Sequence, residues 1–204
     1  MTDFVFRLDR AKSYELALVE LLNQSGFVTA LNGTEHTHPD FANQLRSSED
    51  PTSLFIRFQP DGVACIGNTP RTFYFEVKSS RTIEKMAYDQ YMKLASLGNI
   101  VVIFFGFKND DAIEFRWNFI EDIRMRNSYS VLDGYRKVNG GNQENIPIID
   151  NWLTPRMLPK ESYEQWKQKN KSSGTPYAVV NFTSLLVLSD FKEMIIDRLN
   201  NSKP

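Results

Sequence analysis

Residues 54–78 read Leu54-Phe-Ile-Arg-Phe-Gln-Pro-Asp-Gly-Val-Ala-Cys-Ile66, then Gly67-Asn-Thr-Pro70, then Arg71-Thr-Phe-Tyr-Phe-Glu-Val-Lys78. Two runs rich in β-branched and aromatic residues flank a short turn that contains glycine and proline. This pattern is typical of two antiparallel strands joined by a tight connection. The sequence therefore predicts a β-hairpin formed by residues 54–66 and 71–78.

The register of this hairpin brings polar side chains together. With the turn centred between residues 68 and 69, Asp61 lies opposite Glu76, and a slip of one or two residues still leaves the two carboxylates close. Because side chains alternate along a strand, Glu76 and Lys78 share one face while Val77 points to the other. We therefore expect Asp61, Glu76 and Lys78 to converge.

The segments around the hairpin predict an α/β fold. Apolar residues recur at helical spacing over 11–25 and again from Ser79-Ser80 through Leu97, and Gly26 and Gly98 stop the two patterns. The near-continuous apolar run 100–105 is typical of a strand buried on both faces, so that 71–105 forms a strand, a crossover helix and a parallel strand. Further elements are expected as strands at 27–31, 112–119 and 177–182, helices at 119–126 and 185–199, and a loop at 32–53.

Polar residues interrupt the apolar stripes of both expected helices. In the first helix, Leu18, Val19 and Leu22 form a stripe, and Glu15 lies in the middle of it. In the second, Gln90 interrupts a stripe made of Ile83, Met86, Ala87, Leu94 and Leu97. Glu15 alone is also consistent with a first-turn glutamate favoured by the helix dipole, and Gln90 with a hydrogen-bonded core residue.

Composition excludes several classes of protein. The chain has 204 residues, of which 41% are hydrophobic and 24% charged, so it can bury a core and form one domain. Cys65 is the only cysteine, which excludes an intramolecular disulfide and every multi-cysteine zinc motif. The apolar runs are far shorter than the ~20 residues of a membrane helix, and the N-terminus lacks a signal-peptide core. We expect a cytoplasmic protein without membrane contact.

The expected cluster of acidic residues and a lysine points to metal-assisted hydrolysis. Glu15, Asp61 and Glu76 offer the hard oxygen ligands that Mg²⁺ prefers, and the ion leaves coordination positions for a phosphate oxygen and a water. Lys78 beside the ion can hold the attacking water or stabilise charge that develops on phosphorus. Each residue alone has an ordinary structural explanation, but together they favour hydrolysis of a phosphodiester bond.

These residues carry a resemblance to a known superfamily. Pro60-Asp61, followed by a hydrophobic strand and then Glu76-Val77-Lys78, is similar to the motif of the PD-(D/E)XK nucleases. The first helix, Glu15-Leu-Ala-Leu-Val-Glu-Leu-Leu-Asn-Gln-Ser-Gly-Phe27, resembles that of archaeal-type Holliday junction resolvases. The resemblance covers about residues 11–106.

The resemblance implies a fold and a role for each site residue. The fold is a restriction-endonuclease-like α/β core, with a central mixed β-sheet flanked by helices and a C-terminal addition at about 107–204. Asp61, Glu76 and the carbonyl of Val77 would bind Mg²⁺, for which Mn²⁺ can substitute, and Glu15 would complete the site. Lys78 would act on the attacking water, and Gln90 lies where related nucleases carry a glutamine. The implied activity is that of a Mg²⁺-dependent DNA endonuclease, and such enzymes usually work as homodimers.

Two features depart from the resolvase pattern. The segment between the first strand and Asp61 is longer, and it contains a second Pro-Asp pair, so that Asp40 is an alternative metal ligand. We favour Asp61, because the hairpin register places it beside Glu76. The other departure is the addition at 107–204, which we expect to select the substrate.

The C-terminal addition contains a basic segment suited to a nucleic-acid backbone. Within 123–143, only Asp133 opposes four basic residues, namely Arg124, Arg126, Arg136 and Lys137. A solvated loop with ordinary charges explains the segment equally well. The alternatives to a resolvase are a sequence-specific restriction or homing-type endonuclease with the same site, a DNA-end or single-strand processing enzyme, and a non-catalytic nucleic-acid binding module.

Overall fold

A computed structural model describes the chain over residues 3–32, 45, 50–67, 71–80, 82–109, 112–125, 129–130, 137–138, 148–149, 177–180 and 185–201. They fall into two compact units. The first is drawn from Met1–Ser80, Gln90–Ile120 and Leu186–Pro204, and the second from Arg81–Asp89 and Glu121–Leu185. One domain over 1–204 stays a prediction.

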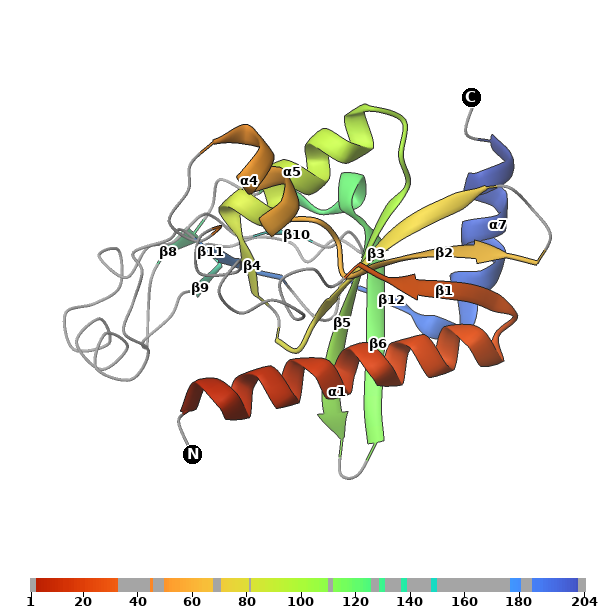
Figure 1. The fold of residues 1–204 in the computed structure, drawn as a ribbon, viewed down its shortest axis with the longest axis horizontal. Coiled ribbons are helices and arrows are strands. Elements are labelled where there is room, and N and C mark those ends of the chain that lie inside the picture. Colours follow the sequence, from red (N-terminus) through yellow and green to blue (C-terminus); the bar gives the residue numbers. More distant parts are fainter. Residues whose placement is uncertain are drawn as a thin grey trace. The chain divides into compact units, whose positions relative to one another are not determined.

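The first unit is built on a six-stranded mixed sheet in the order β1-β2-β3-β5-β6-β12 (Figure 1). Only β3 and β5 pair in parallel; the other neighbours are antiparallel. The α/β fold with a mixed sheet flanked by helices is therefore confirmed. Its strands are β1 (Phe27–Leu31), β2 (Gly62–Ile66), β3 (Thr72–Lys78), β5 (Val101–Asn109), β6 (Ala112–Phe119) and β12 (Leu186–Val187).

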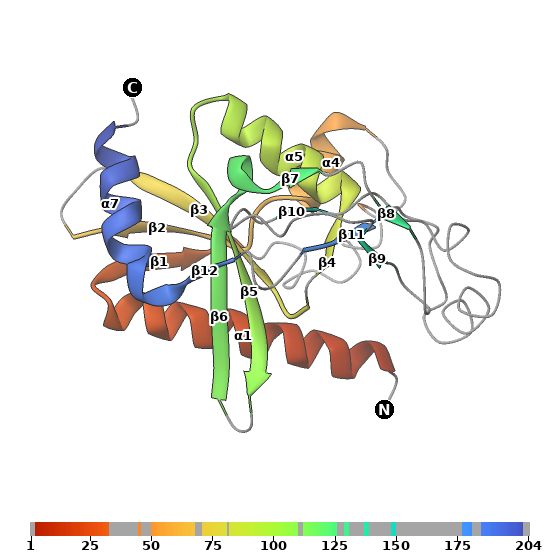
Figure 2. The same ribbon diagram turned by 180° about the vertical axis from the view of Figure 1, so that it is seen from behind.

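Helices α1 (Asp3–Gln24) and α7 (Phe191–Asn201) share one hydrophobic core with the sheet (Figures 1 and 2). Leu18 and Leu22 of α1 are fully buried in this core. The ring of Phe191 at the start of α7 lies 5.0 Å from that of Phe104 and 4.8 Å from that of Trp117, measured between centroids. Phe73 and Phe75 belong to the same core. Because side chains alternate along a strand, Tyr74 between them and Glu76 after them face the other side of the sheet.

The predicted hairpin register is confirmed. β2 and β3 pair with Gly62 opposite Phe75, and the ladder continues to Cys65 opposite Thr72. The predicted β3-helix-β5 unit is also confirmed, since α5 (Lys85–Ser96) connects β3 to the parallel strand β5. The strands expected at 27–31 and 112–119 have the predicted bounds, and Gly26 and Gly98 adopt positive φ of 90° and 87° after their helices.

Residues 54–57 were expected to be strand, and this prediction is wrong because they belong to the helix α4 (Pro51–Arg57). Asp50 caps α4, since its carboxylate accepts hydrogen bonds from the backbone N–H of Thr52 and Ser53 at 3.0 Å each. Pro51 occupies the first turn, where a missing N–H costs nothing. The capping signal therefore outweighed the apolar pattern of residues 54–57.

Three further boundaries differ from the prediction. The first helix begins at Asp3, eight residues earlier than expected. The last helix begins at Phe191, because residues 186–187 pair with β6 as β12 and the 3-10 helix η4 (Leu188–Asp190) follows. Leu97, expected in a buried stripe, is 71% exposed, since it lies beyond the end of α5.

The second unit consists of short pairings in its described residues. The strand β4 (Thr82–Glu84) was expected to be helical, but it pairs antiparallel with β11 (Tyr177–Val179). β-branched Thr82 and Ile83 favour that extended pairing. The helix expected at 119–126 is reduced to the 3-10 helix η1 (Ile120–Asp122). Its first residue belongs to the first unit and its other residues to the second. The remaining pairs join β7 (Arg124–Met125) to β10 (Ile148–Ile149) and β8 (Tyr129–Ser130) to β9 (Lys137–Val138).

Gly62, directly after Asp61, has no room for a side chain. A Cβ there would lie 2.3 Å from Cζ of Phe75 and 2.7 Å from the carbonyl oxygen of Ala30. Because the Phe75 ring is fully buried, Gly62→Ala is expected to lower the free energy of unfolding by about 1–3 kcal/mol, measured by urea titration.

Gly67→Asn is the matched control for this substitution. A Cβ at Gly67 meets nothing within 4 Å, and its φ of 52° is one that asparagine tolerates. The control is expected to change stability by less than about 0.5 kcal/mol. Equal effects of the two substitutions would contradict the close packing inferred at Gly62.

Candidate active site

Asp61, Glu76 and Lys78 meet at one end of the β2–β3 hairpin, as predicted. Asp61 immediately precedes β2, and the register that pairs Gly62 with Phe75 sets Asp61 beside Glu76. On the other side, Leu31 pairs with Gly62, and the backbone N–H of Asn32 donates to the carbonyl oxygen of Asp61 at 2.8 Å. Asn32, Asp61 and Glu76 thus form one row across three neighbouring strands.

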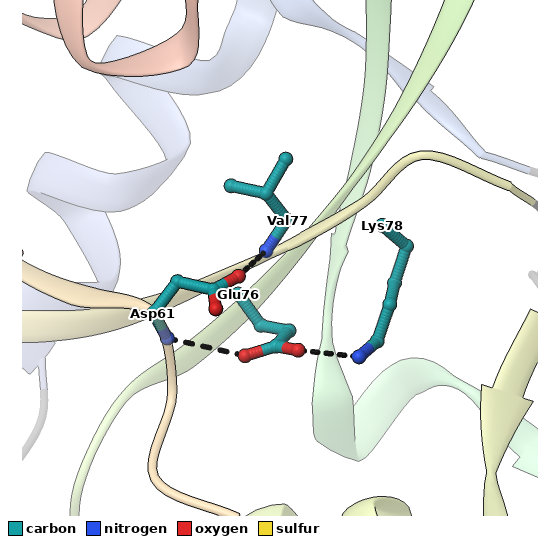
Figure 3. A network of polar contacts seen from close by, with 4 residues as sticks. All are labelled: Asp61, Glu76, Val77 and Lys78. Atoms are coloured by element: carbon teal, nitrogen blue, oxygen red, sulfur yellow. Dashed lines mark hydrogen bonds and ion pairs between the residues drawn. The ribbon is translucent and has the colours of Figure 1, made fainter. Parts of the chain in front are cut away.

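Hydrogen bonds hold the two carboxylates in fixed positions (Figure 3). The backbone N–H of Asp61 donates to Oε2 of Glu76 at 3.1 Å, and the backbone N–H of Val77 donates to Oδ2 of Asp61 at 2.7 Å. Nζ of Lys78 donates to Oε1 of Glu76 and forms an ion pair with it. Each carboxylate is therefore oriented by a backbone group of the opposite strand.

The site concentrates negative charge in a buried position. Glu76 is 4% exposed and is the one charged side chain that is buried among the described residues. Burial, and next to it the charge of Glu76, raises the pKa of Asp61 well above its ordinary value of 3.8. Lys78 and the N–H of Val77 oppose this shift in the pKa, and the charge of Glu15 adds to it. One lysine therefore does not neutralise the acidic groups.

Glu15 and Gln90 lie on the helices that the sequence assigned to them. Glu15 is partly buried on α1, and its charge acts on the pKa of Asp61, so it is an electrostatic neighbour of the pair. Gln90 is partly buried in α5. The catalytic roles of both residues stay predictions.

In the part of the chain that the structure describes, no three Asp, Glu, His or Cys side chains gather into a group that could hold a metal ion. The structure brings two carboxylates together and leaves Glu15 outside a close cluster of three. Two carboxylates are compatible with Mg²⁺, which keeps several waters and commonly binds through one or two carboxylates and substrate phosphates.

Asn32 contacts the Pro60–Asp61 segment but was not singled out from the sequence. Besides the backbone bond, Nδ2 of Asn32 donates to the carbonyl oxygen of Pro60 at 3.3 Å. An asparagine at the end of an expected strand is ordinary turn chemistry, so no signal in the sequence separated it from other loop residues. Its position in the row became evident only from the pairing of β1 with β2.

Several predicted residues cannot be placed in the site. Asp40, Arg126 and Arg136 lie outside the described residues. The backbone of Arg124 lies in β7 and that of Lys137 in β9. Their contact with nucleic acid stays a prediction.

Comparisons with known proteins return a structural match. No protein-family model matches the chain, and no curated protein matches it. Among solved structures, the chain is similar to Hjc, a Holliday junction resolvase from the archaeal hyperthermophile Archaeoglobus fulgidus. The match covers 55% of this chain and 78% of that one, at 16% identity and a TM-score of 0.36. The roles of individual residues therefore depend on the geometry of the site.

Proposed function

We propose that this chain is a Mg²⁺-dependent DNA endonuclease that hydrolyses phosphodiester bonds. The observation that carries the proposal is the hydrogen-bonded arrangement of half-buried Asp61, buried Glu76 and half-buried Lys78 at the end of one hairpin. A largely buried acidic pair, with one carboxylate buried and the other half-buried beside a single lysine, is costly for a protein unless the site has a use. Cleavage of a phosphate diester is the chemistry that uses both carboxylates and the ammonium group.

The donor set fits a hard divalent cation. Two carboxylates from neighbouring strands, with negative charge in excess of the one lysine, suit Mg²⁺ or Mn²⁺ and not a metal that prefers sulfur or nitrogen. Asp61, Glu76 and the carbonyl of Val77 are the proposed ligands. Glu15, whose charge acts on Asp61 from α1, is proposed to complete the site when the ion is bound. An ion held by these residues would supply Lewis-acid polarisation of the phosphate and would lower the pKa of a water molecule.

The chain's own groups position the reactants. The N–H of Val77 fixes the Asp61 carboxylate, and the N–H of Asp61 fixes that of Glu76, so both carboxylates are oriented before substrate arrives. Lys78, held by Glu76, places an ammonium group where it orients the attacking water or stabilises negative charge that develops on the phosphate. Gln90 assists from the crossover helix.

The proposed partner is DNA, and the proposed assembly is a homodimer, because one site cuts one strand. Arg124, Arg126, Arg136 and Lys137 are proposed to contact the phosphate backbone. Across the described ranges, no helix has the length and the hydrophobicity needed to cross a bilayer. The favoured substrate is branched DNA, as for a resolvase. The alternative is a specific sequence in duplex DNA, as for a restriction or homing-type endonuclease.

Cleavage of two substrates tests the proposal. The protein is incubated with supercoiled plasmid and with a synthetic four-way junction, each with Mg²⁺, Mn²⁺ or EDTA. Cutting is expected with either ion and is expected to stop in EDTA and in the Asp61→Ala and Glu76→Ala variants. Asp40→Ala is the matched control, since it removes the other Pro-Asp carboxylate, and it is expected to keep wild-type activity.

Each other outcome changes a specific part of the proposal. Loss of activity in Asp40→Ala equal to that in Asp61→Ala would show that Asp61 is the wrong choice between the two aspartates as the metal ligand. Preferential cutting of random duplex at a fixed sequence would favour a restriction or homing-type enzyme over a resolvase. No cutting of either substrate with either ion, together with retained DNA binding, would favour the non-catalytic binding module.

A further inference from the structure

We infer that Asn32 is a positioning residue for both proposed metal ligands, an inference that rests on the proposed function. Asn32 makes two hydrogen bonds to the segment that carries Asp61. Its backbone N–H donates to the carbonyl oxygen of Asp61 at 2.8 Å, and its side-chain Nδ2 donates to the carbonyl oxygen of Pro60 at 3.3 Å. The carbonyls on both sides of the Asp61 N–H are therefore held by one residue.

The peptide group between Pro60 and Asp61 connects Asn32 to Glu76. Its oxygen accepts the hydrogen bond from Nδ2 of Asn32, and its N–H donates to Oε2 of Glu76 at 3.1 Å. Because a peptide group is planar, fixing the oxygen also fixes the direction of the N–H on the other side. Donation to the carbonyl also polarises the amide, which strengthens the bond that its N–H gives to the carboxylate.

The same contact sets the direction of the Asp61 side chain. Asp61 extends from this peptide group to accept the N–H of Val77 at 2.7 Å. Rotation of the peptide group would move the Cα–Cβ bond of Asp61 and the donor to Glu76 together. Pro60 is buried, and the side chain of Asn32 supplies a direct restraint on the peptide group that follows it.

The side-chain amide is therefore expected to matter for metal binding more than for folding. In Asn32→Ala the backbone bond to Asp61 remains, and β1 and β2 keep their pairing. Residues that orient metal ligands typically contribute 10–100-fold to metal affinity or activity. The expected effect is a rise of about 10-fold in the Mg²⁺ concentration for half-maximal cleavage, with KM for DNA unchanged.

The test compares Asn32→Ala with a control and a conservative variant. Asn23→Ala is the matched control, since Asn23 is an exposed asparagine on α1 whose Oδ1 accepts from Oγ1 of Thr29 at 3.0 Å. Asn32→Gln keeps an amide donor and is expected to recover most of the metal affinity. For each variant, the Mg²⁺ midpoint of cleavage is measured together with the Mn²⁺ concentration that half-saturates the rise in Tm, which requires no cleavage.

The outcomes separate positioning from folding and from the proposed function. A purely structural defect lowers the active fraction and kcat but leaves both metal midpoints unchanged, and that result overturns the inference. If Asn32→Ala does not fold, Asn32→Ser replaces it in the test, since serine also lacks the side-chain amide. Unchanged metal midpoints in Asn32→Ser would then overturn the inference. An active wild-type chain with unchanged midpoints in the variants refutes the positioning role alone. A wild-type chain that neither cuts DNA nor gains Tm from Mn²⁺ refutes the proposed function and this inference with it.

Discussion

The Asp61→Asn variant is expected to lose cleavage by about 10³-fold or more and, without metal at neutral pH, to unfold at a higher temperature than the wild-type chain. The loss of activity follows from the proposed role of Asp61 as a metal ligand. The gain in stability follows from removing a charge that the folded state disfavours. Both are measured on the same preparation, by plasmid cleavage and by thermal unfolding in EDTA.

The gain in stability has an electrostatic cause. Burial and the neighbouring charge of Glu76 raise the pKa of Asp61 well above 3.8, so folding at neutral pH either keeps the Asp61 charge in an unfavourable place or takes up a proton. Asparagine has no charge, and its side-chain oxygen can still accept the N–H of Val77 that Asp61 accepts. Each 1 kcal/mol gained is expected to raise Tm by about 2–4 °C in a chain of this size.

The pH dependence of this gain has a definite sign. A carboxyl whose pKa is raised by folding contributes stability that is fully present below its unfolded-state pKa, and this contribution is lost as pH rises through the folded-state pKa. The advantage of Asp61→Asn is therefore expected at about pH 7 and is expected to disappear as pH falls toward about 4. An advantage that grows on acidification would contradict the raised pKa of Asp61.

Replacement of Lys78 by methionine is also expected to lower activity strongly, but with the opposite effect on stability. Lys78→Met should lower cleavage by about 10²–10³-fold, since it removes the ammonium group that is proposed to orient the attacking water. It should also lower the free energy of unfolding by about 1–3 kcal/mol at neutral pH. The measurements are the cleavage rate at saturating Mg²⁺ and urea unfolding in EDTA.

The destabilisation arises because Glu76 cannot be solvated after the lysine is lost. The Glu76 side chain is 5% exposed and that of Lys78 is 23% exposed, so the ion pair is largely shielded from water. Without Lys78, the N–H of Asp61 is the remaining hydrogen-bond donor to Glu76 shown in Figure 3. A buried carboxylate without its cation partner is costly, even where the intact pair adds little net stability.

The double variant Glu76→Gln/Lys78→Met is the control for this explanation. It removes both charges, so it is expected to recover most of the stability lost in Lys78→Met while remaining inactive. If the double variant is as unstable as Lys78→Met, lost packing of the lysine stem and not the unpaired charge explains the effect.

Much of the site could be predicted because it depends on local pairing. The strand alternation of Glu76, Val77 and Lys78 and the short turn after Ile66 determine which residues face each other. These features lie within a single hairpin, and the observed pairing of Gly62 with Phe75 has the predicted register. The stripe of α1 likewise placed Glu15 on the side of the helix where its charge reaches Asp61.

The errors occur where local signals compete or where a distant segment supplies the partner. For residues 54–57, capping by Asp50 outweighed an apolar pattern compatible with strand. Residues 82–84 are extended because β11, almost a hundred residues away along the chain, pairs with them. Residues 186–187 similarly pair with β6, and Nε1 of Trp117 donates to the carbonyl oxygen of Val187 at 2.9 Å.

The sequence by itself determined the pairing of β2 with β3 and the approach of Asp61 to Glu76, because short turns and alternating side chains act between residues close in the chain. The tertiary structure alone decided that Asn32 lies beside Asp61, because the pairing of β1 with β2 joins segments that are about thirty positions apart in the sequence. It also decided how deeply Glu76 is buried, since burial depends on the elements packed around a strand and not on the strand itself.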